Sequence, residues 1–74
     1  MKKYAKELQV GDRVTDVDNS SGFTGVVFEV AEIKKKEKII SFKNLSSVDG
    51  GYSPNPKNGL FEFYLDSQTQ WILL

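Results

Sequence analysis

Two short apolar segments, separated by a polar loop and punctuated by glycine, constrain the fold of this chain more than any other feature. They cover residues 8–14 and 22–30. In the second segment Val26, Phe28 and Val30 recur at every second position, which is the period of a β-strand with one buried face. Gly11 accepts the positive φ of a tight bend, and Asp12 can hydrogen-bond the backbone of that turn. The pattern predicts strongly bent strands, as in a small β-barrel.

The rest of the chain predicts further strands and one long irregular segment. Strands are expected at residues 8–17, 24–33, 38–43, 60–66 and 71–74. A charged turn at 34–37 makes a hairpin of the second and third strands. Residues 1–7 are expected to form a loose turn or one short helical turn, and residues 66–70 a short connector, with a 3₁₀ turn as one option. Residues 44–59 lack any periodic pattern, and loops of that length are usually functional or disordered.

These elements predict one all-β domain over residues 1–74, a five-stranded SH3-like partly open barrel with a long irregular loop at about 44–59. A five-stranded OB-type barrel and a meander sheet that dimerises through its apolar face are the alternatives. An OB barrel typically carries a helix between its third and fourth strands. Since the 44–59 segment is rich in Gly, Pro and Ser, it is a poor helix and favours the SH3-like barrel.

The composition excludes several kinds of chemistry. The chain has no Cys and no His, so it has neither a disulfide nor a His- or Cys-based catalytic group. Residues 16–22 resemble a calcium loop at first, but Ser21 and Val27 stand where an EF-hand needs Gly and Glu. Asp16 and Asp18 are interpreted as solvated turn residues. We therefore expect no enzyme activity, no cofactor and no metal.

The location of the protein is predicted from the same features. The lack of cysteine fits a reducing compartment. The basic N-terminal segment is not followed by an apolar run of signal-peptide length, and no segment approaches the ~20 apolar residues of a membrane span. A cytoplasmic protein without a membrane partner is expected.

The charges cancel overall but are unevenly placed. Ten basic and ten acidic residues give zero net charge. One cluster is nevertheless strongly basic and is opposed only by Glu37; its members are Lys34, Lys35, Lys36, Lys38 and Lys43. Such a cluster is either a solvated hairpin tip, which discourages edge-to-edge aggregation, or a phosphate-binding surface. Only one arginine, Arg13, is present, and arginine is the preferred residue for bidentate phosphate contacts, so nucleic acid is the alternative partner.

The motifs at the two apolar segments resemble those of a known family. Val10-Gly11-Asp12-Arg13-Val14, followed by the Gly22-x-x-Gly25-x-Val27 hairpin start, resembles the KOW and Tudor-like branch of SH3-like barrels. The resemblance covers residues 8–43. It implies a module without catalytic residues that binds RNA, ribosomal or polymerase partners, methylated side chains or other proteins. The short cysteine-free chain also resembles accessory proteins of bacteriophages.

Aromatic residues and prolines supply the candidates for protein binding. Tyr52, Pro54 and Pro56 lie in the long loop, where proline reduces the entropy lost on binding. Tyr64 falls on the outward row of its strand and is expected to be exposed, whereas Trp71 is expected in the core. A Tudor-type cage would require Tyr52, Tyr64 and Trp71 to converge on one cation.

These observations rank three functions. The first is a non-enzymatic interaction module that binds another protein or self-associates, such as a phage-type accessory protein or an inhibitor of a host factor. A homo-oligomer would also stabilise a small core that has no disulfide or metal. The alternatives are a KOW-like nucleic-acid-binding domain that uses the lysines of residues 34–43, and an oligomer that sequesters a small ligand or a nucleotide.

Overall fold

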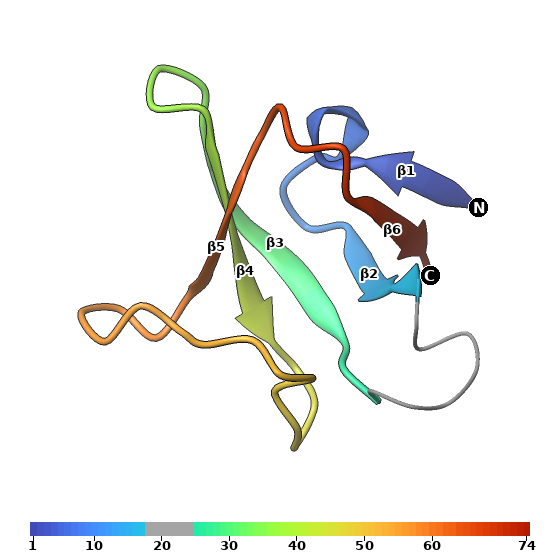
Figure 1. The fold of residues 1–74 in the computed structure, drawn as a ribbon, viewed down its shortest axis with the longest axis vertical. Coiled ribbons are helices and arrows are strands. Elements are labelled where there is room, and N and C mark those ends of the chain that lie inside the picture. Colours follow the sequence, from blue (N-terminus) through green and yellow to red (C-terminus); the bar gives the residue numbers. More distant parts are fainter. Residues whose placement is uncertain (18–24) are drawn as a thin grey trace.

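The computed structural model describes residues 1–17 and 25–74, and these residues form a single antiparallel sheet with six strands (Figure 1). The strand order across the sheet is β1-β6-β2-β3-β4-β5. The elements are β1 (Lys2–Tyr4), the 3₁₀ helix η1 (Ala5–Glu7), β2 (Arg13–Asp16), β3 (Phe28–Lys34), β4 (Ile39–Asn44), β5 (Phe61–Tyr64) and β6 (Gln70–Leu73). The sheet curves around a core without closing, so the prediction of an all-β, partly open barrel is confirmed.

The number of strands differs from the prediction by one, because the N-terminus contributes β1. Lys2, Lys3 and Tyr4 pair with Ile72, Trp71 and Gln70 of β6. This segment has no apolar alternation, so its strand is held by backbone pairing and carries no sequence signal of a buried face. The predicted helical turn follows it as η1, where the Tyr4 amide donates to Glu7 Oε1 at 2.9 Å.

The first predicted strand is shorter than expected because residues 8–12 form the bend that precedes it. Gly11 has a φ of +96°, and its amide donates to the Val30 carbonyl at 2.9 Å. The Gln9 amide donates to Asp12 Oδ2 at 2.8 Å. Gly11 therefore adopts the positive φ and Asp12 accepts the backbone hydrogen bond that the sequence predicted, and the turn is hydrogen-bonded to β3.

A β-bulge corrects the alternation within the β3–β4 hairpin. Val30 pairs with Phe42 and Glu32 with Ser41, which leaves Ala31 as the extra residue. Without the bulge, Glu32 would face the core and Ile33 the solvent, because side chains alternate strictly along a strand. With it, Ile33 packs against the core and Glu32 is exposed.

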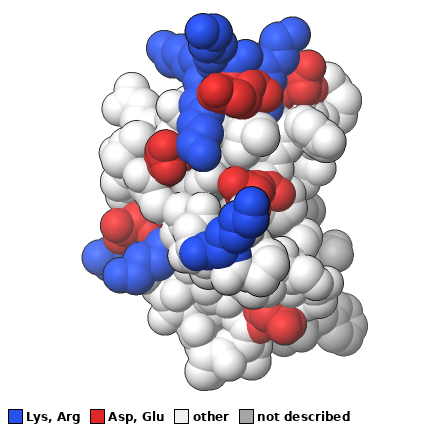
Figure 2. All heavy atoms as spheres, turned by 90° about the vertical axis from the view of Figure 1, so that its left-hand side faces the viewer, with Lys and Arg blue, Asp and Glu red and all other residues white. Residues whose placement is uncertain are grey.

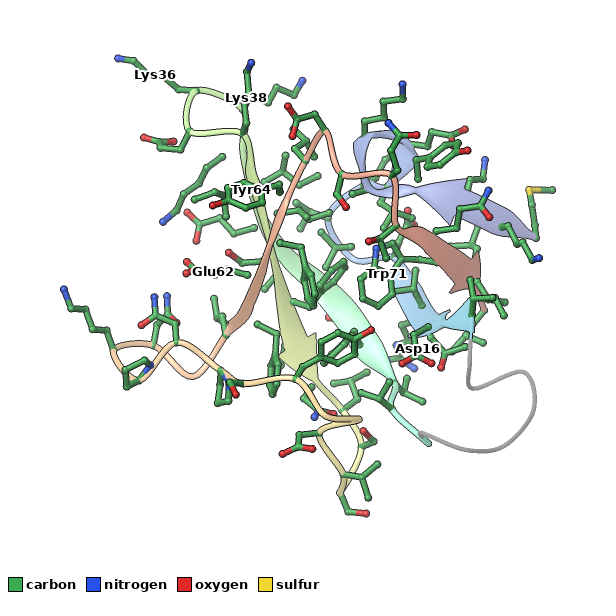
Figure 3. All side chains as sticks on the ribbon, in the orientation of Figure 1. Asp16, Lys36, Lys38, Glu62, Tyr64 and Trp71 are labelled. Carbon is green, nitrogen blue, oxygen red and sulfur yellow. The ribbon has the colours of Figure 1, made fainter. Side chains whose placement is uncertain are left out.

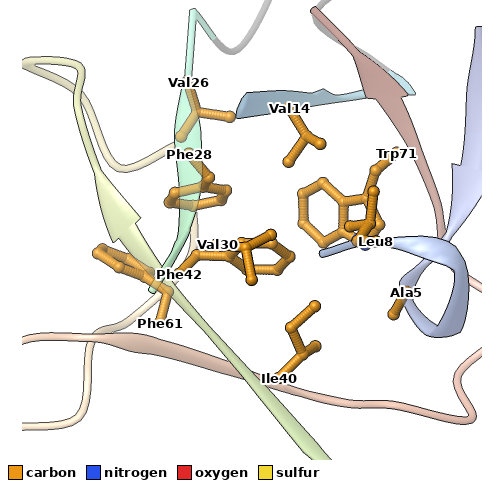
Figure 4. Close-up of a cluster of buried hydrophobic side chains, with 10 residues drawn as sticks. All are labelled: Ala5, Leu8, Val14, Val26, Phe28, Val30, Ile40, Phe42, Phe61 and Trp71. Carbon is orange, nitrogen blue, oxygen red and sulfur yellow. The ribbon is translucent and has the colours of Figure 1, made fainter. Parts of the chain in front are cut away.

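Aromatic rings dominate the core (Figure 4). Phe28, Phe42 and Trp71 are fully buried, and the Phe42 and Trp71 ring centroids lie 4.9 Å apart. The buried cluster comprises Ala5, Leu8, Val14, Val26, Phe28, Val30, Ile40, Phe42, Phe61 and Trp71. The prediction that Trp71 belongs to the core is confirmed. Rings of this size remove much apolar surface from water, which suits a small domain without a disulfide.

Part of the motif that suggested the fold lies outside the described residues. This applies to Gly22, Phe23 and Thr24, and to the predicted loop at residues 18–22 with Asp18. Within residues 1–17 and 25–74, no helix has the length and apolar character needed to cross a bilayer.

Candidate functional site

The tip of the β3–β4 hairpin presents four lysines, Lys34, Lys35, Lys36 and Lys38, which we call the lysine tip. A turn closes the hairpin, with the Lys38 amide 3.3 Å from the Lys35 carbonyl oxygen. Lys38 has a φ of +59°, and among the described residues it is the one non-glycine residue with a positive φ. This left-handed conformation costs an L-residue about 1 kcal/mol relative to glycine. The turn thus holds a lysine where glycine would be less strained.

A fifth lysine reaches the same end of the molecule from a distant part of the sequence. The lysine tip, the turn after β5 and η1 lie at one end of the sheet (Figure 1). They border a cleft of about 340 Å³ lined by Lys6, Lys35, Lys38, Leu65 and Asp66. We call Lys6 together with the lysine tip the lysine end. Sequence reasoning missed Lys6 because its place depends on how the N-terminal segment pairs with β6.

The hairpin lysines are not neutralised by the rest of the structure. Within the described part of the chain, the one ion pair joins Arg13 Nε and Glu29 Oε2 at 3.2 Å, away from the lysine end. Lys6 Nζ lies 6.0 Å from the centroid of the Tyr4 ring. Lysine side chains gather over the hairpin at the top of the face in Figure 2, with few carboxylates among them. Glu37 and Asp66 only partly offset this positive charge.

The structure does not place Lys43 with the other lysines of the predicted cluster. Lys34 pairs with Ile39 at the turn end of the hairpin, whereas Lys43 pairs with Glu29 four residues further along β4. Four residues of strand span about 13 Å. Lys43 therefore lies beside the Arg13–Glu29 ion pair, and a ligand at the lysine end need not reach it.

The outer face of the sheet carries Tyr64 next to the lysine tip. In the lateral register, Tyr64 of β5 pairs with Ile39 of β4, and Ile39 pairs with Lys34 of β3. Tyr64 is 72% exposed, as its outward position predicted. A shallow cavity of about 240 Å³ is lined by Ile39, Glu62, Phe63 and Tyr64. Figure 3 shows Tyr64 and Glu62 on the side of β5 that faces away from Trp71.

The next row of this face is acidic. Glu32, Ser41 and Glu62 are neighbours across β3, β4 and β5. Ser41 is buried between them, and its Oγ has no hydrogen-bond partner among the described residues. The row places two carboxylates below the lysine tip, so the positive surface ends after one row of the sheet.

Tyr52 lies on the opposite face from Tyr64. Its ring packs against those of Phe28, Phe63 and Trp71, with the Phe63 centroid 5.2 Å away. Trp71 itself is fully buried. The three rings considered for an aromatic cage therefore do not surround a common space, and Tyr52 serves as a half-buried extension of the core.

The long loop is held by its own polar side chains. Asn44 Oδ1 accepts from the Ser46 amide at 2.8 Å, and Ser46 Oγ accepts from the Val27 amide at 3.2 Å. Further along, the Asn55 amide donates to the Leu60 carbonyl at 2.8 Å, and Asn55 Nδ2 donates to Glu62 Oε1 at 3.0 Å. The loop is therefore ordered at the end of the sheet opposite the lysine tip.

The two prolines of the loop flank Asn55 and are exposed. Pro54 and Pro56 face solvent, whereas Tyr52 is turned toward the core and Tyr64 lies on β5. The four residues considered for protein binding thus do not form one continuous surface. Of the four, Tyr64 and the prolines are accessible to a partner.

The interpretation of Asp16 as a solvated residue is wrong. Asp16 is 5% exposed and lies opposite Trp71 in the β2–β6 ladder. It borders a cavity of about 220 Å³ that is also lined by Val17, Tyr52, Gln68, Thr69 and Gln70. Asp18, its suggested partner, lies outside the described residues. Across the described ranges, no three acidic side chains gather as a metal site would require.

The lysine end is therefore the candidate site with the strongest unmatched charge, and Tyr64 is the exposed aromatic residue beside it. Comparison of the chain with protein-family models, with curated proteins and with solved structures finds no significant match.

Proposed function

We propose that this protein is a non-enzymatic binding module whose lysine end binds the phosphates of a nucleic acid. One observation carries the proposal: three lysines from two distant segments, Lys6, Lys35 and Lys38, line one cleft, and the four lysines of the hairpin form no ion pair within the described structure. Gathering like charges raises the free energy of the folded state through their mutual repulsion. A polyanionic ligand would relieve that repulsion.

The backbone of the turn supports a functional reason for these lysines. Lys38 occupies a left-handed conformation that glycine would adopt with less strain. Strain of this kind persists in binding sites because selection for function outweighs the small loss of stability. A turn that served only to connect β3 to β4 would gain stability from glycine or asparagine at this position.

The charge distribution sets the strength of the expected binding. Lysine is a point charge without the bidentate geometry of arginine, and Glu32 and Glu62 restrict the positive surface to the hairpin end. At most five phosphates can be neutralised by Lys6 and the lysine tip. For a single strand, the slope of log K against log salt should then be no steeper than about −3.5.

The partly open all-β barrel is compatible with this function. We further propose that the barrel is SH3-like and of the KOW and Tudor-like type, which the Gly11–Asp12 bend supports. Members of that branch include RNA-binding modules. We also propose that the protein acts in the cytoplasm, which is supported by the absence of cysteine.

Fluorescence anisotropy with labelled single- and double-stranded RNA and DNA tests the proposal. At low salt the wild-type protein should bind, and Lys35→Glu/Lys38→Glu should weaken binding at least about tenfold. Lys43→Glu is the matched control, because it reverses an exposed lysine of the same hairpin outside the lysine end. Absence of wild-type binding to all four nucleic acids, or equal losses in both variants, would refute the proposal.

Self-association or protein binding through β5 is the second candidate, and the sheet edge favours it. The Leu65 amide donates to the Lys38 carbonyl at 2.8 Å, so the alternation of an antiparallel ladder points the Glu62 and Tyr64 amides away from β4. At the start of β5 the Asn55 amide donates to the Leu60 carbonyl, and at its end the Ser67 amide donates to the Tyr64 carbonyl. The outward-pointing backbone groups of β5 between these two hydrogen bonds could pair with an added strand.

Light scattering tests this second candidate directly. A dimer that returns to one chain on Tyr64→Ala would support pairing through β5. A mass of one chain at all concentrations would exclude self-association, and capture of a protein partner that is independent of Tyr64 would exclude β5 as the contact surface.

A further inference from the structure

We infer that Tyr64, Ile39 and Glu62 form a site for one unpaired base of a single-stranded nucleic acid, next to the phosphates held by the lysine end. The inference rests on the proposed function and names its ligand more narrowly. These residues and Phe63 line a cavity of about 240 Å³. That volume lies below the ~300–1,000 Å³ range of drug-sized pockets and suits a single planar group.

Tyr64 supplies the stacking surface. Among the residues that the structure describes, it is the most exposed aromatic side chain, at 72%, and it stands beside Ile39 in the same lateral row. Proteins that bind single strands combine a positive surface with aromatic rings on which bases stack. A duplex keeps its bases stacked inside, so a base reaches a ring on a protein surface only when it is unpaired.

The position of the lysines relative to Tyr64 fits one nucleotide and its neighbours. Lys34 is two strands away from Tyr64 in the same row, a spacing of about 10 Å between Cα atoms. Leu65, the residue after Tyr64, borders the cleft that holds Lys6, Lys35 and Lys38. Leu65 packs against the core, on the opposite face of β5 from Tyr64. A base on Tyr64 therefore places its neighbouring phosphate near Lys34, and the nucleic-acid strand must cross the end of β5 to reach the cleft.

Glu62 gives the site a preference among bases. Glu62 lines the cavity, and Asn55 Nδ2 donates to its Oε1 at 3.0 Å, which fixes the orientation of the carboxylate. A carboxylate accepts hydrogen bonds, so it suits the exocyclic amino group of cytosine and opposes the O4 acceptor of thymine. It also disfavours an acidic peptide, which would bring a second carboxylate to this place. The site should thus prefer cytosine over thymine.

Anisotropy titrations with labelled ten-nucleotide oligo-dC and oligo-dT test the inference. The wild-type protein should bind oligo-dC about three- to tenfold more tightly than oligo-dT. Tyr64→Ala should weaken both about five- to a hundredfold, whereas Tyr64→Phe, which keeps the ring, should stay within about twofold of wild type. Since Tyr64 is exposed, neither substitution opens the core.

Glu62→Gln isolates the base preference. Glutamine can accept from cytosine and donate to thymine, so the ratio of the two affinities should fall to about one even if the loss of a negative charge strengthens both. A wild-type ratio near one, or a ratio unchanged by Glu62→Gln, would overturn the role of Glu62. Equal binding by wild type and Tyr64→Ala would overturn the base site.

The outcomes separate this inference from the proposed function. If Lys35→Ala/Lys38→Ala weakens oligonucleotide binding while Tyr64→Ala does not, the lysine end binds polyanions and the base site is refuted. If no oligonucleotide binds, both proposals fail. If polyglutamate of matched charge binds as tightly as oligo-dC and Tyr64→Ala weakens neither, the lysine end binds polyanions of any class and the inference is overturned.

Discussion

The lysine tip and the long loop lie at opposite ends of the same sheet and use polar residues in different ways (Figure 1). In the loop, Asn44, Ser46 and Asn55 hydrogen-bond to nearby backbone or side chains, and Tyr52 packs on the core. At the tip, the lysine side chains form no ion pair within the described residues, and the backbone of Lys38 is strained. The polar side chains of the loop thus bind groups of the folded chain, whereas the lysine side chains of the tip form no ion pair with the described residues.

This difference shows why an irregular segment is a poor guide to function by itself. Asparagine and serine are frequent in loops because they bond to the backbone and replace missing ladder hydrogen bonds. The tip is a short turn that many sequences could close with less strain. A residue that lowers stability and has no partner in the folded chain is the stronger indication of an external ligand.

The largest effect is expected for Tyr52→Ala, which separates the loop's structural role from binding. Loss of the ring contacts with Phe28, Phe63 and Trp71 should lower the free energy of unfolding by about 2 kcal/mol, less than for a fully buried ring. Urea denaturation measures this change. The variant should keep wild-type affinity for oligonucleotides where it is folded; a specific loss of affinity would move the binding site to the loop.

A comparison of charge reversals at the two ends is expected to give the next largest difference. Lys35→Glu/Lys38→Glu should weaken oligonucleotide binding at least about tenfold, or 1.4 kcal/mol. Lys57→Glu, an exposed lysine of the long loop, should change affinity less than about twofold. Anisotropy at one salt concentration measures both. The reverse order of effects would show that the loop binds the ligand.

Lys38→Gly should raise stability and lower affinity together. Relief of the left-handed strain, less the greater backbone entropy of glycine in the unfolded chain, should raise the free energy of unfolding by about 0.5–1 kcal/mol. Affinity should fall severalfold because one cation is lost. Lys38→Ala is the control, since it removes the charge and keeps the strain. If Lys38→Gly were both more stable and equally tight in binding, Lys38 would have no role in the site.

The smallest effect on affinity is expected for Pro54→Ala/Pro56→Ala. Each substitution frees the unfolded chain and should lower the free energy of unfolding by about 0.5 kcal/mol. Oligonucleotide affinity should not change, because neither proline lines the cleft at the lysine end or the cavity beside Tyr64. A measurable loss of affinity would show that the rigid loop takes part in recognition.

Much of the fold could be predicted from local patterns. The period of two in β3 and β4, the bend at Gly11 and the burial of Trp71 all follow from the residues themselves. β1 could not be predicted, because Lys2 and Lys3 pair through their backbones and present no apolar row. The bulge at Ala31 was also missed, although the change from Val30 to Ile33 in the inward row is a signal of it.

The candidate site could be predicted only in part, for a physical reason. The lysine tip and the exposure of Tyr64 are properties of a hairpin and of a single strand. Lys6 lies at the cleft, and Lys43 lies away from the lysine tip. Both positions depend on how strands far apart in sequence are aligned. Tyr52 was assigned to a surface because it lies in a loop, whereas its ring packs against the core.

The salt dependence of oligonucleotide binding tests most directly whether the lysine end is the binding surface. For a single strand, each phosphate neutralised contributes about −0.7 to the slope of log K against log salt. Lys35→Ala/Lys38→Ala should therefore make the slope about 1.4 units shallower than that of the wild type, while Lys57→Ala leaves it unchanged. Identical slopes for wild type and Lys35→Ala/Lys38→Ala would contradict the account.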